Sequence, residues 1–123
     1  MKKSLRGFTL IELIMVIVLL GLLAVVAIPK YYDLQTDAKD AAEKGVVGAV
    51  RSGIYTYYAK NKAYPADLDG YAAGACSSTI KCFDTVLDQG GVQQDWTKAS
   101  GTTYTGPTGT TYTYTAATGA FVQ

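Results

Sequence analysis

The stretch Gly7-Phe8-Thr9-Leu10-Ile11-Glu12 opens the segment of the sequence that decides the fold. An almost wholly apolar run follows it as far as Ile28, and basic residues precede it: Lys2, Lys3 and Arg6. As a helix, residues 8–28 would be roughly 31 Å long at about 1.5 Å per residue, which is enough to cross the hydrocarbon core of a bilayer. The basic residues place the N-terminal end of such a span in the cytoplasm.

Glu12 is the one charged residue inside this apolar run. A lone carboxylate in a membrane helix costs a few kcal/mol on insertion scales, so it needs a partner. The residues alone leave three interpretations open. The segment is an ordinary anchor that tolerates an acid, a removable secretory signal cut near Ala27, or a helix that docks against copies of itself. A carboxylate fits poorly in the apolar region of a secretory signal, which counts against the second interpretation.

The quoted stretch and the apolar helix after it resemble the N-terminal signature of type IV pilins and pseudopilins, the class III prepilin signature. The resemblance implies that a prepilin peptidase cleaves between Gly7 and Phe8. It also implies that Phe8 is N-methylated after cleavage. Glu12 matches the acid that pairs with the N-terminal amine of an adjacent subunit during assembly.

The match runs through Pro29, and Gly21 and Pro29 occupy positions where the family helix loosens inside the filament. Their chemistry agrees, since glycine weakens a helix and proline lacks a donor. The segment that continues to Leu34-Gln35-Thr36-Asp37-Ala38 resembles mannose-sensitive haemagglutinin pilins most closely. Beyond Ala38 the sequence carries no such match.

The chain is short enough for a single small core, and its pattern predicts an α+β fold. Apolar positions at three- and four-residue steps extend the predicted helix to about Ala59. The last quarter alternates Thr and Tyr between Gly-rich turns, which predicts strands at 102–105, 110–115 and 119–122, with Tyr112 and Tyr114 on one face. Together with this pattern, the resemblance implies a type IV pilin fold, in which the apolar half of a long helix protrudes and the rest packs against a small antiparallel sheet. The predicted parts are a leader (1–7), a transmembrane or filament-core half-helix (8–30) and a periplasmic or extracellular head (31–123).

Several positions predict contacts within the head. Lys39–Glu43 and Asp40–Lys44 are spaced to pair on the outer face of the helix. Trp96 is expected to fill the gap between sheet and helix. Small residues either let the sheet approach the helix closely or are neutral helix fillers: Ala41, Ala42, Gly45, Gly48, Ala49 and Gly53.

Cys76 and Cys82 are the only cysteines and lie six positions apart, which predicts a disulfide if this part of the chain is exported. A metal pair or redox dithiol is the alternative, but the chain has no histidine and no Cys-x-x-Cys. Asp67 and Asp69 alternate as calcium ligands do, and major pseudopilins carry such a site. Two aspartates are too few, so we predict a solvated turn and no metal or other cofactor.

The sequence contains no nucleophile elbow, phosphate-binding loop or catalytic cluster, so no enzymatic activity is predicted. The net charge is +1, and loss of the three leader cations leaves 8 basic minus 10 acidic residues, or −2; neither value predicts nucleic-acid binding. The resemblance implies the structural subunit of a homopolymeric type IV pilus, of the kind used in adhesion, motility or DNA uptake. Its partners would be identical subunits, the prepilin peptidase and the pilus assembly machinery. It would be a bacterial inner-membrane precursor and then part of an extracellular surface filament. The alternatives are a pseudopilin of a type II secretion system and a secreted soluble binding module with a cleaved signal peptide.

Overall fold

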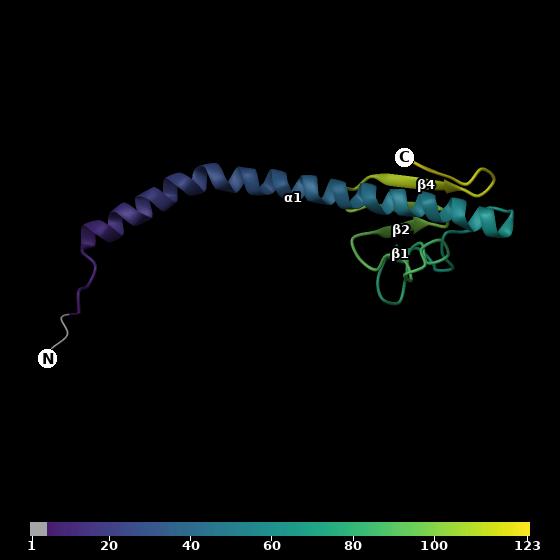
Figure 1. The fold of residues 1–123 in the computed structure, drawn as a ribbon, viewed down its shortest axis with the longest axis horizontal. Helices are drawn as coiled ribbons and strands as arrows, with labels where there is room; N and C mark the ends of the chain where they lie inside the picture. The colour runs from purple at the N-terminus through teal and green to yellow at the C-terminus, as the bar shows by residue number, and fades with distance from the viewer. Residues whose placement is uncertain (1–4) are drawn as a thin grey trace. The chain divides into compact units, whose positions relative to one another are not determined.

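The structure is a computed structural model that describes residues 5–123, so Lys2 and Lys3 lie outside the described residues. The chain divides into two compact units, an N-terminal unit (residues 1–37) and a C-terminal unit (residues 38–123). One helix, α1 (Leu10–Asn61), supplies residues to both units (Figure 1). The predicted boundary between residues 30 and 31 stays a prediction.

Helix α1 confirms the predicted long helix, with both ends shifted two residues along the chain. The first turn follows Thr9, whose carbonyl accepts the N–H of Leu13. At the other end Lys62 has φ 58° and its N–H bonds to the carbonyl of Tyr58, the left-handed geometry that commonly closes a helix. The helix is continuous through Gly21 and Pro29, and their loosening inside a filament stays a prediction.

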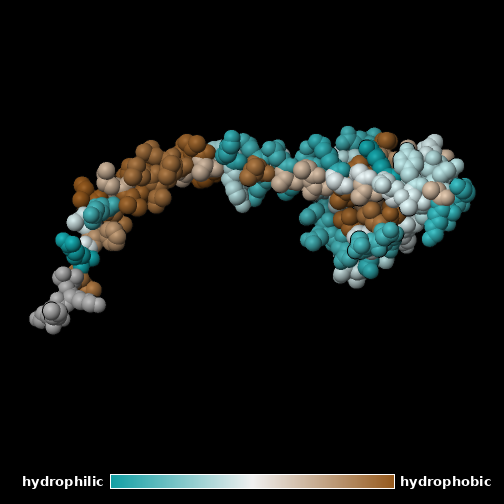
Figure 2. All heavy atoms as spheres, viewed as in Figure 1, coloured by the Kyte–Doolittle hydropathy of each residue, from teal (hydrophilic) through white to brown (hydrophobic). Residues whose placement is uncertain are grey.

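In the N-terminal unit, α1 is long and apolar enough to cross a membrane by length and composition. An 18-residue window there has a mean hydropathy of 3.1, and none of that window is buried. Figure 2 shows these residues as a continuous hydrophobic surface. This surface has no covering among residues 5–123, so it requires lipid or another molecule around it.

The C-terminal unit contains a five-stranded antiparallel sheet with the strands in chain order. The strands are β1 (Gly74–Ala75), β2 (Thr97–Ser100), β3 (Thr103–Thr105), β4 (Thr111–Thr115) and β5 (Ala120–Val122). The α+β prediction is confirmed, and β3, β4 and β5 lie within one residue of the predicted strands. β1 and β2 were not predicted, because β1 is only two residues long and β2 carries Lys98 at its inward position.

The core of this unit lies between the inner face of the sheet and one face of α1. Tyr112 and Tyr114 are buried and the threonines between them are exposed, as the alternation predicts. Trp96 is 3% exposed and packs edge-on to Phe83 at a ring distance of 5.3 Å, which confirms its place in the core. The helix contributes these buried side chains: Glu43, Val47, Val50 and Ile54.

Most of the small residues of α1 act as helix fillers, the second of the two interpretations, and do not let the sheet approach closely. Only Gly53 meets a close neighbour: a Cβ there would overlap the backbone carbonyl of Val86, which belongs to a loop and not to the sheet. A Cβ on Gly45 or Gly48 would meet open space. The sheet instead contacts the helix through large side chains, so most of these small residues are exposed: Ala41, Ala42, Gly45, Gly48 and Ala49.

Candidate processing and assembly site

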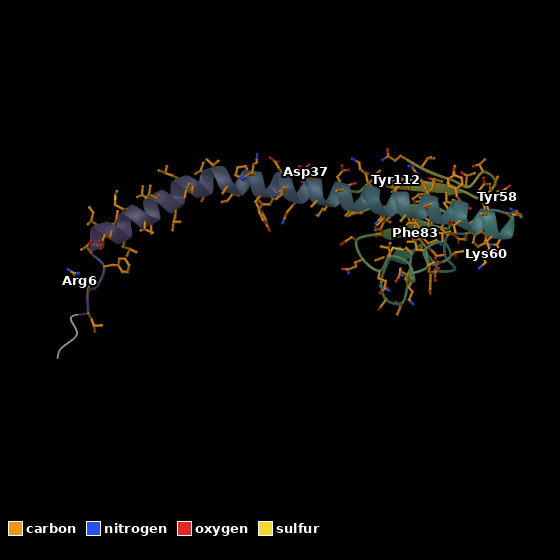
Figure 3. The ribbon with its side chains drawn as sticks, in the orientation of Figure 1. Arg6, Asp37, Tyr58, Lys60, Phe83 and Tyr112 are labelled. Carbon is orange, nitrogen blue, oxygen red and sulfur yellow. A yellow bond between two sulfur atoms is a disulfide. The ribbon has the colours of Figure 1, made fainter. Side chains whose placement is uncertain are left out.

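The Gly7–Phe8 peptide bond lies in a non-helical segment just before α1. Phe8 is 92% exposed, and a Cβ on Gly7 would have no neighbour within 4 Å. Arg6, labelled in Figure 3, comes directly before this pair. An exposed segment without regular structure is the form of backbone that peptidases cleave. The geometry therefore leaves the predicted cleavage position accessible.

Thr9 and Glu12 form a reciprocal pair at the start of α1. The Thr9 N–H donates to Glu12 Oε2 at 2.8 Å, and the Glu12 N–H donates to Thr9 Oγ1 at 3.3 Å. This is a capping box, in which two backbone donors at a helix start gain side-chain acceptors. This box was not predicted, although Thr-x-x-Glu ahead of an apolar run is its sequence signal.

Around Glu12 and after it, α1 presents large apolar side chains in every direction. Leu13, Leu20 and Val25 are 61%, 59% and 72% exposed, and the same holds around the whole helix in this unit. A helix that is apolar on all sides is stable only in lipid or among other helices. The site thus combines an accessible bond, a capped carboxylate and a helix surface that needs partners.

Glu43 anchors α1 to the turn between β3 and β4. It is 2% exposed; its Oε2 accepts the Thr108 N–H at 2.8 Å and the Thr108 hydroxyl at 2.6 Å, and its Oε1 accepts the Tyr112 hydroxyl at 2.8 Å. Burial alone would raise the pKa of Glu43, but these hydrogen bonds outweigh it and the pKa lies below the ordinary value. The predicted Lys39–Glu43 surface pair is therefore wrong, because Glu43 faces the core. The predicted Asp40–Lys44 pair is confirmed, at 2.6 Å.

Asp67 and Asp69 bind Lys98, which corrects the predicted solvated turn. Lys98 and Asp69 are both 1% exposed, and their Nζ–Oδ1 distance is 2.6 Å. Asp67 Oδ2 lies 3.1 Å from the same ammonium, and the Tyr104 hydroxyl donates to Asp69 Oδ2 at 2.8 Å. Burial lowers the pKa of Lys98, but hydrogen bonds to the two carboxylates outweigh it and the pKa is raised. Burial and Asp69 also raise the pKa of Tyr104.

The two aspartates weighed as calcium ligands instead both contact an internal cation, Lys98. Residues 5–123 contain no group of three acidic, histidine or cysteine side chains able to hold a metal ion. Lys98 thus fastens the loop that carries the aspartates to the inner face of the sheet. The sequence signal for the contact between Lys98 and the aspartates is Lys98 itself, an ionisable residue at a strand position where alternation requires an apolar one.

The predicted disulfide is confirmed. Cys76 and Cys82 are bonded, with their Cα atoms 5.6 Å apart, and both are buried. The bridge closes a short loop beside β1, and the backbone of Cys82 pairs with that of Val92.

Comparison with known proteins finds a matching N-terminal motif and relatives named as fimbrial proteins and pilins. The prokaryotic N-terminal methylation motif matches residues 2–28. Fimbrial protein EcpC of Eikenella corrodens is 32% identical over 80 residues, which cover 65% of this chain and 50% of that protein. Type IV major pilin protein PilE of Neisseria gonorrhoeae is 38% identical over 76 residues, covering 62% of this chain and 45% of PilE. Type II secretion system core protein G of Pseudomonas aeruginosa is 35% identical over 72 residues, covering 58% and 51%.

The chain spans about half the length of these relatives. No solved structure matches it significantly. A methylation motif at the start of an apolar helix, followed by a small antiparallel sheet, defines an α+β protein of the pilin type. The chain thus carries a prokaryotic N-terminal methylation motif and is similar, over part of its length, to fimbrial proteins, a type IV major pilin and a type II secretion system core protein. Its narrower resemblance to mannose-sensitive haemagglutinin pilins stays a prediction.

Proposed function

We propose that this chain is the structural subunit of a type IV pilus and polymerises through α1 into a helical surface filament. The observation that carries the proposal is the accessible Gly7–Phe8 bond beside a carboxylate and a helix that is exposed and apolar on all sides. The relatives named as fimbrial proteins and as a major pilin support it. The role is structural and not catalytic.

The proposed sequence of events begins with a precursor in the bacterial inner membrane, with its basic leader in the cytoplasm. A prepilin peptidase cleaves between Gly7 and Phe8, and Phe8 is N-methylated. The assembly machinery then moves the helix from lipid into a bundle of identical helices, where Glu12 pairs with the Phe8 amine of a neighbour. In that low-dielectric bundle each charge needs the other, because an unpaired buried charge is strongly destabilising.

The test is filament formation by Glu12 variants. Glu12→Gln keeps the shape of the side chain without its charge, and Glu12→Ala removes both. We expect both precursors to enter the membrane and both to give few or no filaments in the fraction sheared from cells. Asp33→Asn is the matched control, since it neutralises another exposed acid of α1, and it should assemble normally. Normal filament yield from both Glu12 variants would show that Glu12 has no role in assembly.

A pseudopilin of a type II secretion system is the second candidate, and the similarity to core protein G favours it. The two candidates differ in where the polymer is found. A pilus subunit is recovered in long filaments sheared from the cell surface, whereas deletion of a pseudopilin gene stops protein secretion. Loss of secretion without loss of sheared filaments would favour the pseudopilin.

A further inference from the structure

The proposed function uses the charge of Glu12 but not the hydroxyl of Thr9, which accepts the Glu12 backbone N–H. Each of the two residues accepts the backbone N–H of the other, and both are exposed in the single chain. The carboxylate is thus already engaged before any neighbouring subunit is present.

We propose that Thr9 is a positioning residue for Glu12. In a single subunit the Thr9–Glu12 capping box is the partner of the carboxylate, and assembly replaces this internal partner with the amine of a neighbour. The second half of the inference rests on the proposed function, whereas the first half concerns the isolated subunit alone.

The physical need for such a partner comes from the membrane. A carboxylate in an apolar span costs a few kcal/mol unless it is paired or reaches polar groups. The first backbone N–H groups of a helix also lack partners within the helix, and inside a bilayer no water can replace them. The capping box answers both needs, because it gives the carboxylate a donor and gives two of these N–H groups an acceptor. The partial positive charge of the helix N-terminus adds to the attraction.

The position of the box suits the exchange of partners. Thr9 and Glu12 both lie on the C-terminal side of the Gly7–Phe8 bond, so cleavage leaves the box intact. The backbone N–H that binds the carboxylate belongs to the residue directly after Phe8. The box therefore holds the carboxylate beside the new N-terminus of its own subunit, at the end of the helix where a neighbour's amine is required.

Substitutions separate the capping role from the role of the charge. Glutamine also completes a capping box, so Glu12→Gln keeps the box and removes only the charge. Thr9→Val keeps the shape of the side chain but removes the hydroxyl acceptor. Thr9→Ser retains that acceptor and is its matched control.

The first measurement is amide hydrogen exchange by NMR on the full precursor chain in detergent micelles. Thr9→Val should speed exchange of the Glu12 amide about fivefold, the size expected for a lost N-cap, whereas Thr9→Ser should leave it near the wild-type rate. Glu12→Ala should speed exchange of the Thr9 amide, whereas Glu12→Gln should not. The Leu20 amide, inside the helix, is the internal reference and should not change. Equal exchange in wild type and Thr9→Val would overturn the proposal.

The second measurement is the fraction of precursor inserted into inner-membrane vesicles. Valine is more apolar than threonine, so hydropathy alone predicts better insertion of Thr9→Val. The capping box predicts worse insertion, because the Glu12 backbone N–H loses its acceptor inside the bilayer and the box that holds the carboxylate is weakened. Thr9→Ser retains the hydroxyl acceptor and should insert as well as the wild type. Improved insertion of Thr9→Val over the wild type would overturn the proposal.

Failure of the proposed function would appear in another measurement, the filament yield. Normal filaments from Glu12→Gln would overturn the exchange of partners during assembly, while exchange rates and insertion would still decide whether the box exists in the subunit.

Discussion

Replacing Glu43 tests whether a buried carboxylate joins α1 to the β3–β4 turn. Its two oxygens accept three hydrogen bonds, two from Thr108 and one from Tyr112. In Glu43→Gln the side-chain oxygen can face Thr108, but its NH₂ group then faces the Tyr112 hydroxyl, which must turn and accept. Hydrogen bonds to a charged group contribute about 1.5–3 kcal/mol each and neutral ones about 0.5–1.5 kcal/mol.

The weakening of the three hydrogen bonds is partly offset, because Glu43→Gln also removes the cost of burying a charge. We therefore expect Glu43→Gln to lower the free energy of unfolding by about 1–2 kcal/mol at pH 7. Glu43→Ala leaves buried donors unpaired and should cost about 3–5 kcal/mol. The assay is urea unfolding of the detergent-solubilised chain, followed by the fluorescence of Trp96, the only tryptophan.

The lowered pKa of Glu43 determines the direction in which the free energy of unfolding changes with pH. The pKa of Glu43 in the folded chain lies below its ordinary value of 4.5, so folding favours the ionised form. Its contribution is complete above that value and is lost as the pH falls through the lowered pKa. The stability difference between wild type and Glu43→Gln should therefore be constant near neutrality and shrink below about pH 4.5.

Asp40→Asn is the matched control, since it removes an exposed acid of the same helix that pairs only with exposed Lys44. It should leave the urea midpoint unchanged. The reasoning fails if Glu43→Gln is as stable as wild type at pH 7, or if the difference between them grows on acidification.

Three further predictions concern the stability of the C-terminal unit, and the unfolding assay above measures each free-energy change. Alkylation without reduction should label neither Cys76 nor Cys82, and replacing both with alanine should cost about 2 kcal/mol for so short a loop; full labelling of the native chain would contradict the disulfide. Lys98→Met should cost about 3–5 kcal/mol, because two carboxylates lose their cation. Since the pKa of Lys98 is raised above 10.5, the stability difference between the wild type and Lys98→Met should persist below about pH 10. It should narrow as the pH rises through the raised pKa. Disappearance of this difference already near pH 7 would contradict the buried pair. Gly53→Ala should destabilise by about 1–3 kcal/mol because its Cβ meets a backbone carbonyl, whereas Gly48→Ala, facing open space, should stabilise by up to about 1 kcal/mol; the same sign for both would contradict the packing.

The sequence predicts those parts of the fold that depend on local periodicity. The continuous apolar run and the three- and four-residue repeat after it predicted α1, and alternation of Thr and Tyr predicted β3, β4 and β5 with the correct inward face. The motif of the processing segment is contiguous, and cleavage between Gly7 and Phe8 stays a prediction. Its capping box follows from the spacing of two residues within that motif.

The buried ionic contacts could not be predicted from the sequence, because their partners are distant in the chain. Glu43 and Thr108 are 65 positions apart, and Lys98 and Asp69 are 29 positions apart. On a helix or in a loop, such charged residues are most often exposed, so Glu43 was assigned to a surface pair and Asp69 to a solvated turn. Only the folded chain brings in the donors that make their burial favourable.

The central claim is that this chain is processed at Gly7–Phe8 and polymerises, and one measurement tests it most directly. Filaments are sheared from cells that express the chain, and the subunit is analysed by intact mass and N-terminal peptide sequencing. We predict a subunit that begins at Phe8, carries one methyl group on its amine and forms the bulk of the filament. A mature chain that begins at Ile28, or one found only as a soluble secreted protein, would contradict the account.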